Sequence, residues 1–186
     1  IPVAKMLAQV RENPAMPIHW GANQPGMQAG AEHDTTVKIP VHLADAYRTF
    51  TNWTVGAAVN GCFYVAPQDA WRFAAWLAAD MSQAFADAGY HKQVSNRPTE
   101  PYQWMRVIVT ATEWDNFFEL RLSELADPNM FELARLARKV LDHSTPIVRA
   151  VHMPYVDDME RIQMPDVMQA AMASAARICG TTCDGV

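Results

Sequence analysis

The chain has 186 residues, of which 50% are hydrophobic and 19% charged, so it suits one domain of ordinary size and excludes a disordered polymer. Its net charge of −5 argues against general binding to nucleic acid or to an anionic membrane, although a few arginines can still hold a phosphorylated small molecule. No apolar run reaches the roughly 18 residues that span a bilayer.

The cysteines and the N-terminus carry information about the cellular compartment of the protein. Three cysteines, an odd number without a regular framework, favour a reducing compartment, and we expect a cytoplasmic protein. Cys179 and Cys183 form the motif C-G-T-T-C, which is either a metal or redox pair or two free thiols, and we favour free thiols because no second pair exists. No signal peptide is visible, and Ile1 is not expected to be the translated start.

A first helix is predicted over residues 2–12, followed by a long loop. The helix has an apolar face at Met6, Leu7 and Val10, and Asn13-Pro14 ends it. Residues 13–41 contain four prolines and three glycines, which predict a loop. Four polar side chains of this loop either bind a ligand or satisfy the loop's own backbone, and both interpretations stay open: His19, Asn23, Gln24 and Gln28.

Two more helices are predicted next. The apolar face of the first consists of Leu43, Ala46, Tyr47 and Phe50. The second runs from about Gln68 to Ala88, with Gly89 as its C-terminal cap. Its predicted apolar stripe is rich in small residues, which suggests close helix packing, including between subunits: Trp71, Ala74, Ala75, Ala78, Met81 and Phe85.

The second half begins with a predicted strand over residues 104–112, because β-branched residues are dense there. Thr110 and Glu113 match a capping box, so we expect a helix to begin at Thr110 with Trp114, Phe117, Phe118 and Arg121 on one face.

Asp127-Pro128 should start a further helix that ends near Asp142, with Phe131, Ala134, Leu136 and Val140 along it. Residues 144–164 are predicted to be a loop, and 165–178 a last helix. The fold class is therefore α+β, mostly helical with a small antiparallel sheet.

Sequence signatures of common enzyme classes are missing. The chain has no G-x-S-x-G, P-loop, G-x-G-x-x-G or H-E-x-x-H motif, and its six histidines lack ligand spacing, so we predict no metal site. Two arginines beside amides and aromatic rings remain as candidates for a planar anion: Arg97 and Arg121. Each has an alternative as a salt-bridge partner, Arg97 with Glu100, and Arg121 with Glu119 or Glu124.

The segment HKQVSNRPTEPYQWMRVIVTATEWDNFFELR (91–121) resembles the flavin-dependent thymidylate synthases (the ThyX family), in particular a divergent branch common in phages. NPAMPIHWGANQPGMQA (13–29) is also similar to that branch, and the resemblance spans about residues 1–160. It implies a single ThyX-like domain over 1–186 that lacks N-terminal and perhaps C-terminal segments of the family, and the host cytoplasm if a phage encodes it.

The resemblance also implies an activity and its site. The family makes dTMP from dUMP with FAD, methylenetetrahydrofolate and NADPH, and is a homotetramer with shared sites. By motif position, Arg121 is implied as the catalytic residue that binds the pyrimidine, Arg97 as a dUMP ligand and Asn116 as a flavin contact. An arginine suits this chemistry because it stabilises the negative charge that develops on the base.

The chain departs from the family at several points. The Arg-His-Arg and serine-rich signature, which precedes the segment matching Ile1, is not in the sequence, and Thr110-Ala111-Thr112 stands where typical members have Asn-Ala-Arg. Three hypotheses follow: a synthase, a non-catalytic nucleotide- or flavin-binding remnant of that fold, or a structural protein that keeps only the oligomeric scaffold.

Overall fold

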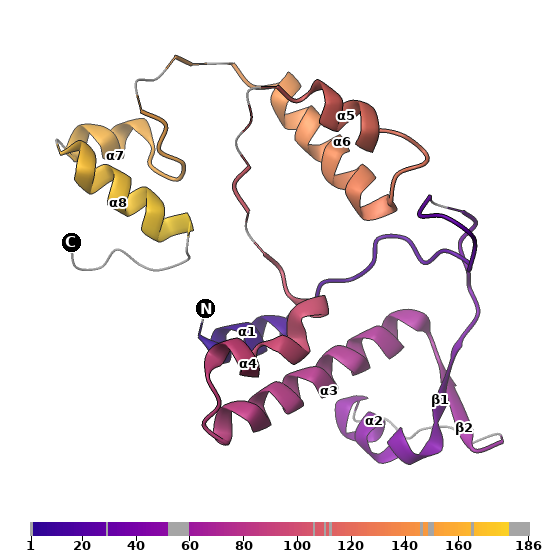
Figure 1. The fold of residues 1–186 in the computed structure, drawn as a ribbon. Coiled ribbons are helices and arrows are strands. Elements are labelled where there is room, and N and C mark those ends of the chain that lie inside the picture. Colours follow the sequence, from indigo (N-terminus) through magenta and orange to yellow (C-terminus); the bar gives the residue numbers. More distant parts are fainter. Residues whose placement is uncertain are drawn as a thin grey trace.

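The structure is a computed structural model, and it describes residues 2–28, 30–51, 60–105, 107–109, 111, 113–145, 147–148, 151–164 and 166–178. It is mostly helical with one two-stranded antiparallel sheet, as the α+β prediction requires (Figure 1). In chain order the elements are α1 (Val3–Glu12), β1 (Val37–Pro40), the 3-10 helix η1 (Val41–Leu43), α2 (Ala44–Thr51), β2 (Cys62–Val65), α3 (Pro67–Asp87), α4 (Lys92–Ser95), the 3-10 helix η2 (Arg97–Tyr102), α5 (Asp115–Arg121), α6 (Pro128–Asp142), α7 (Asp158–Gln163) and α8 (Val167–Ile178).

Helix α1 packs on α3, and both sequence predictions of helix position are confirmed there. Leu7 and Val10 of α1 form one core cluster with Ala75 and Ala79 of α3, each at most 2% exposed. The predicted apolar stripe of α3 is wrong in part, because Met81 is 56% exposed. The buried face of α3 consists of Phe73, Ala75, Ala79 and Ser82. Its small residues let α1 of the same chain pack closely against α3.

The sheet and α2 build a second cluster around the first half of α3. Strands β1 and β2 pair with Ile39 opposite Phe63, and both side chains are buried. Phe73 of α3 contacts this cluster, and the predicted apolar face of α2 covers it: Leu43, Ala46, Tyr47 and Phe50. Strand β1 lies inside the segment predicted as loop, so that prediction is wrong at residues 37–40.

A polar turn follows α3. Gly89 has a φ of +83°, as its predicted role as a helix cap requires. The hydroxyl of Ser82, fully buried on α3, donates to the carbonyl of Ser95 at the end of α4. Thr99 is also fully buried and donates to the Asn96 carbonyl at 2.9 Å. These bonds fix the turn that carries Arg97.

The prediction for residues 104–114 is wrong in two respects. The described residues between 104 and 112 form no strand, and Val107 and Val109 are more than 60% exposed. High β-propensity is not sufficient, because a strand needs a neighbour to pair its backbone groups. Helix α5 begins at Asp115 rather than at Thr110, which lies outside the described residues, and its cap Trp114 makes no side-chain capping bond.

Helices α5 and α6 form a hairpin. The side chain of Asp127 accepts hydrogen bonds from the backbone N–H groups of Asn129 and Met130, at 3.0 and 3.1 Å, so the predicted start of α6 is confirmed. Ala134 of α6 is fully buried, whereas Leu136 and Val140 are exposed.

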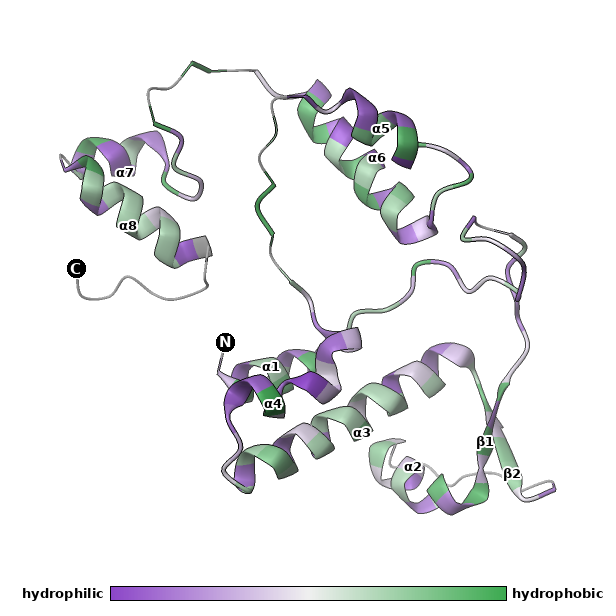
Figure 2. Cartoon of the chain, in the orientation of Figure 1, coloured by the Kyte–Doolittle hydropathy of each residue, from purple (hydrophilic) through white to green (hydrophobic). Residues whose placement is uncertain are grey.

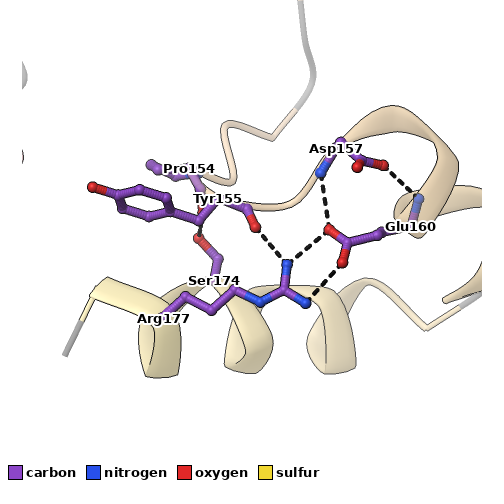
Figure 3. A network of polar contacts seen from close by, with 6 residues as sticks. All are labelled: Pro154, Tyr155, Asp157, Glu160, Ser174 and Arg177. Carbon is purple, nitrogen blue, oxygen red and sulfur yellow. Dashed lines mark hydrogen bonds and ion pairs between the residues drawn. The ribbon is translucent and has the colours of Figure 1, made fainter. Parts of the chain in front are cut away.

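The prediction of a loop over 144–164 is wrong at residues 158–163, which form α7. Polar contacts join the start of α7 to α8 (Figure 3). Asp157 and Glu160 form a capping box at the start of α7. Glu160 also receives two bonds from Arg177 of α8, at 2.7 and 2.8 Å. Arg177 donates in addition to the Tyr155 carbonyl at 2.5 Å. A small apolar cluster lies beneath: Met153, Val156, Ala170 and Ala173. None of the described helices is both long enough and apolar enough to cross a membrane.

Candidate functional site

Arg97 lies at the first residue of η2, on the surface. Its guanidinium is 3.1 Å from a carboxylate oxygen of Glu100, and its side chain is 72% exposed. The salt-bridge alternative for Arg97 is thus present in the structure. Because an exposed pair of this kind is worth at most about 1 kcal/mol, an anionic ligand can displace Glu100 at little cost.

Asn116 and Arg121 both lie exposed on α5. No residue that the structure describes forms an ion pair with Arg121, so the pairings with Glu119 or Glu124 are not formed. The two residues are five positions apart, which turns them about 140° from each other around the helix. A single flat ligand therefore cannot contact both from one side of α5.

The rings before Arg121 form a compact aromatic cluster. The ring centroids of Trp114 and Phe117 are 5.8 Å apart, and those of Phe117 and Phe118 are 5.4 Å apart. Phe118 is 5% exposed, while Trp114 and Phe117 are half-buried. The two partly exposed rings give the surface of α5 aromatic area, which is suited to a flat heterocycle.

Sequence reasoning missed Arg138 of α6. Its guanidinium carbon lies 5.3 Å from the centroid of the Phe118 ring, a cation–π contact that helps to close the hairpin. Its Nε is 2.9 Å from a carboxylate oxygen of Asp142. The i,i+4 spacing to Asp142 is visible in the sequence, but the contact with Phe118 depends on how two helices pack.

The structure does not bring Arg97 into contact with the α5 residues. Within the described part of the chain, no hydrogen bond or ion pair joins η2 to α5, and an extended stretch separates them (Figure 1). The predicted site residues are thus exposed and accessible on two separate surfaces.

The long loop after α1 forms a polar hollow of about 240 Å³ against the start of α6. Its tip is closed by its own amides: Gln24 donates to the Gln28 carbonyl at 2.6 Å, and Gln28 to the Pro25 carbonyl at 3.2 Å. For these two residues the backbone-satisfying interpretation is confirmed. The Nδ1 atom of His19 lies 2.8 Å from a carboxylate oxygen of Glu32, and its Nε2 atom is buried without a hydrogen-bond partner in the described residues.

Tyr102, near the surface of Arg97, has a shifted pKa. Burial raises the pKa of the Tyr102 phenol at the end of η2. Its ring packs edge-on against the Trp71 ring, and the two ring centroids are 5.4 Å apart. The Tyr102 ring also packs against the cluster of α1 and α3, so it contributes to the core. Cys179 and Cys183, the predicted pair of free thiols, lie outside the described residues.

Comparisons with known proteins gave no match: no family model, no curated protein and no solved structure resembles the chain at a significant level. The function proposed below is therefore based on the sequence motifs and on where the structure places their residues.

Proposed function

We propose that this protein is a flavin-dependent thymidylate synthase-like enzyme, which transfers a one-carbon unit to C5 of dUMP and reduces it to give dTMP. FAD is its cofactor, and methylenetetrahydrofolate and NADPH are its co-substrates. The observation that carries this proposal is Arg121, an exposed arginine that no described carboxylate neutralises, at the end of the motif TEWDNFFELR.

The role of Arg121 follows from charge. The uracil ring becomes more anionic as C5 attacks the carbon donor, and a fixed guanidinium stabilises that charge most where water is excluded. Its planar fork also donates two parallel bonds to an anion. An arginine already paired with Glu119 or Glu124 would lose that bond on binding substrate, and Arg121 has no such bond to lose among the described residues.

Arg97 and Asn116 are assigned to binding. Arg97 holds dUMP after exchanging its exposed pair with Glu100 for the nucleotide. The exposed amide of Asn116 fits contact with a flavin, which when bound would supply the reducing equivalents. Because Arg97 and α5 do not touch within the described chain, we propose that other subunits of a homotetramer complete the site.

The second candidate is a non-catalytic nucleotide- or flavin-binding protein, or a structural remnant of the same fold. It is favoured by the absence of any contact between η2 and α5 in the described residues. A remnant that binds flavin without making dTMP would keep the Asn116 surface and lose the combination of Arg97 with Arg121.

Two measurements test the proposal on protein expressed from its full reading frame. Added FAD should give a flavin absorption band that stays with the protein on gel filtration. Release of tritium from C5-labelled dUMP should then require all co-substrates. Flavin without tritium release would select the non-catalytic alternative, and a protein that retains no flavin would refute both flavin-based functions.

A further inference from the structure

Helix α5, which carries Arg121, buries one of its own side chains. Phe118 is 5% exposed, and the other residues of α5 are half-buried or exposed. The cap residue Trp114 makes no side-chain capping bond. A helix of two turns is marginally stable by itself in water, so its direction depends on what packs around Phe118.

Arg138 of α6 covers the ring of Phe118. Its guanidinium carbon lies 5.3 Å from the centroid of that ring. The neighbouring rings of Trp114 and Phe117, with centroids 6.2 and 5.4 Å from that of Phe118, belong to α5 and its cap residue. They therefore move with Phe118, whereas Arg138 connects its ring to another helix. Figure 2 shows hydrophilic and hydrophobic residues side by side on both helices of this hairpin.

Asp142 holds Arg138 in this position. The Nε atom of Arg138 lies 2.9 and 3.2 Å from the two carboxylate oxygens of Asp142, which is one turn further along α6. The guanidinium is thus bound by a carboxylate of α6 while it contacts the ring of Phe118 on α5. Because two contacts restrict its rotamers, Arg138 acts as a fixed support for Phe118.

Arg121 lies next to Phe118 on the surface of α5. Residues three apart on a helix are separated by about 60° around its axis and by about 5–6 Å between their Cβ atoms. A change in how Phe118 packs therefore shifts Arg121 with it. A displacement of about 1 Å at a reacting group can cost about a hundredfold in rate.

We propose that Arg138 is a positioning residue for Arg121. Its cation–π contact with Phe118, fixed by Asp142, sets the direction of α5 on α6 and so holds the Arg121 guanidinium where the pyrimidine becomes anionic. The inference rests on the proposed function and adds a residue that acts through Arg121 and not on the substrate.

The first test compares two substitutions of Arg138 in the full chain. Arg138→Met keeps the length of the side chain and removes its charge, and it should lower kcat for tritium release roughly tenfold with little change in the KM for dUMP. Arg138→Lys keeps a cation for the Phe118 ring and should retain most of the activity. The control is Arg135→Met, which removes an arginine of the same helix that binds Glu132 through two bonds of 2.6 Å. It should leave kcat unchanged.

A double-mutant cycle separates positioning from a general loss of folded protein. If Arg138 acts through Arg121, Arg138→Met should cause no further loss of turnover in the Arg121→Ala background. A general loss of folded protein would lower turnover by the same factor in both backgrounds, and that result would overturn the proposal. An unchanged kcat in Arg138→Met, beside an active wild type, would overturn it as well.

Amide exchange provides a measurement that does not depend on activity. Arg138→Met should lower the protection of α5 amides and leave that of α8 amides unchanged in the same sample. Unchanged protection of α5 would refute the support by Arg138 even if the wild type makes dTMP. A wild type that releases no tritium, with α5 less protected in Arg138→Met, would instead refute the enzyme function and with it the positioning of Arg121, so the two failures are distinguishable.

Discussion

Arg121 has no ion-pair partner in the described part of the chain, and this makes its substitution informative. We expect Arg121→Ala to lower dTMP formation by roughly a hundred- to a thousandfold, about 3–4 kcal/mol at the transition state. The melting temperature should hardly change, because the exposed side chain forms no ion pair with described residues. Tritium release and thermal melts measure the two effects.

The matched comparison at this scale is Arg72→Ala, which removes an exposed arginine of α3 paired with Asp69 at 3.1 Å. It should leave turnover unchanged. Arg121→Lys should rescue poorly, because a point charge cannot replace a bidentate fork. Near-normal dUMP binding and turnover in Arg121→Ala would show that the catalytic assignment is wrong.

Glu160 gives the α7–α8 hairpin a dependence on pH. Its hydrogen bonds from Arg177, and then from the Asp157 backbone, lower the pKa of the Glu160 carboxyl. A group whose pKa is lower in the folded state contributes stability above its unfolded pKa and loses it as the pH falls through the folded one. The protection of α8 amides, measured as their exchange rate relative to that of an unstructured peptide at the same pH, should therefore fall as the pH drops below the ordinary range of a glutamate. Glu160→Gln should flatten that dependence, and an unchanged pH profile would contradict this role.

Among the elements, amphipathic helices were predictable and isolated extended segments were not. Asp127-Pro128 and the apolar faces of α1 and α2 located three helices because capping and periodicity act within one helix. Helix α7 was missed although Asp157 and Glu160 form a capping box that the sequence displays. Whether residues 104–112 form a strand depends on a neighbouring strand, which the local sequence does not encode.

In the candidate site too, contacts within one element were predictable and contacts between elements were not. The pair of Arg97 with Glu100 was predictable, because residues three apart on a helical turn are neighbours. The cation–π contact between Arg138 and Phe118 was not, because it depends on how α5 packs on α6.

The N-terminal cap of α6 should make a measurable contribution to the stability of the α5–α6 hairpin. The Asp127 carboxylate holds two backbone N–H groups of the first turn, so Asp127→Ala should destabilise the α5–α6 hairpin by about 1 kcal/mol. Asp127→Asn should retain most of that stability. Asp87→Ala is the control, because Asp87 is exposed at the end of α3 and caps no N-terminus. Urea titration followed by circular dichroism would measure the unfolding midpoint, and an unaffected midpoint in Asp127→Ala would show that the cap is dispensable.

A substitution at Gly89, which follows α3, tests how much backbone strain alone affects stability. A Cβ added there would meet no atom within 4 Å, but its φ of +83° is one that residues other than glycine adopt at a cost. Gly89→Ala should therefore destabilise the protein by about 1–2 kcal/mol without any clash. Asp87→Ala again serves as the control, and thermal unfolding by circular dichroism measures both. Equal melting temperatures for Gly89→Ala and wild type would mean that this turn is not held in its left-handed conformation.

At the scale of the whole molecule, the buried apolar residues form several small clusters rather than one large core. Among the described residues, one cluster joins α1 to α3, a second joins α2 and the sheet to α3, and a third joins the segment before α7 to α8. Small cores stabilise a chain only marginally, because the conformational entropy of folding is offset by little buried area. In the proposed homotetramer, contacts between subunits would add to the stability of these small clusters.

The last prediction concerns the link between the proposed self-association and unfolding. If association stabilises the folded chain, unfolding becomes linked to dissociation, and the melting temperature rises with protein concentration. Over a hundredfold range we expect a rise of roughly 3–5 °C for the wild type, from a gain of about 2.7 kcal/mol per pair of chains. Scanning calorimetry over that range decides the matter, because a concentration-independent wild-type melting temperature would mean that each chain is stable alone.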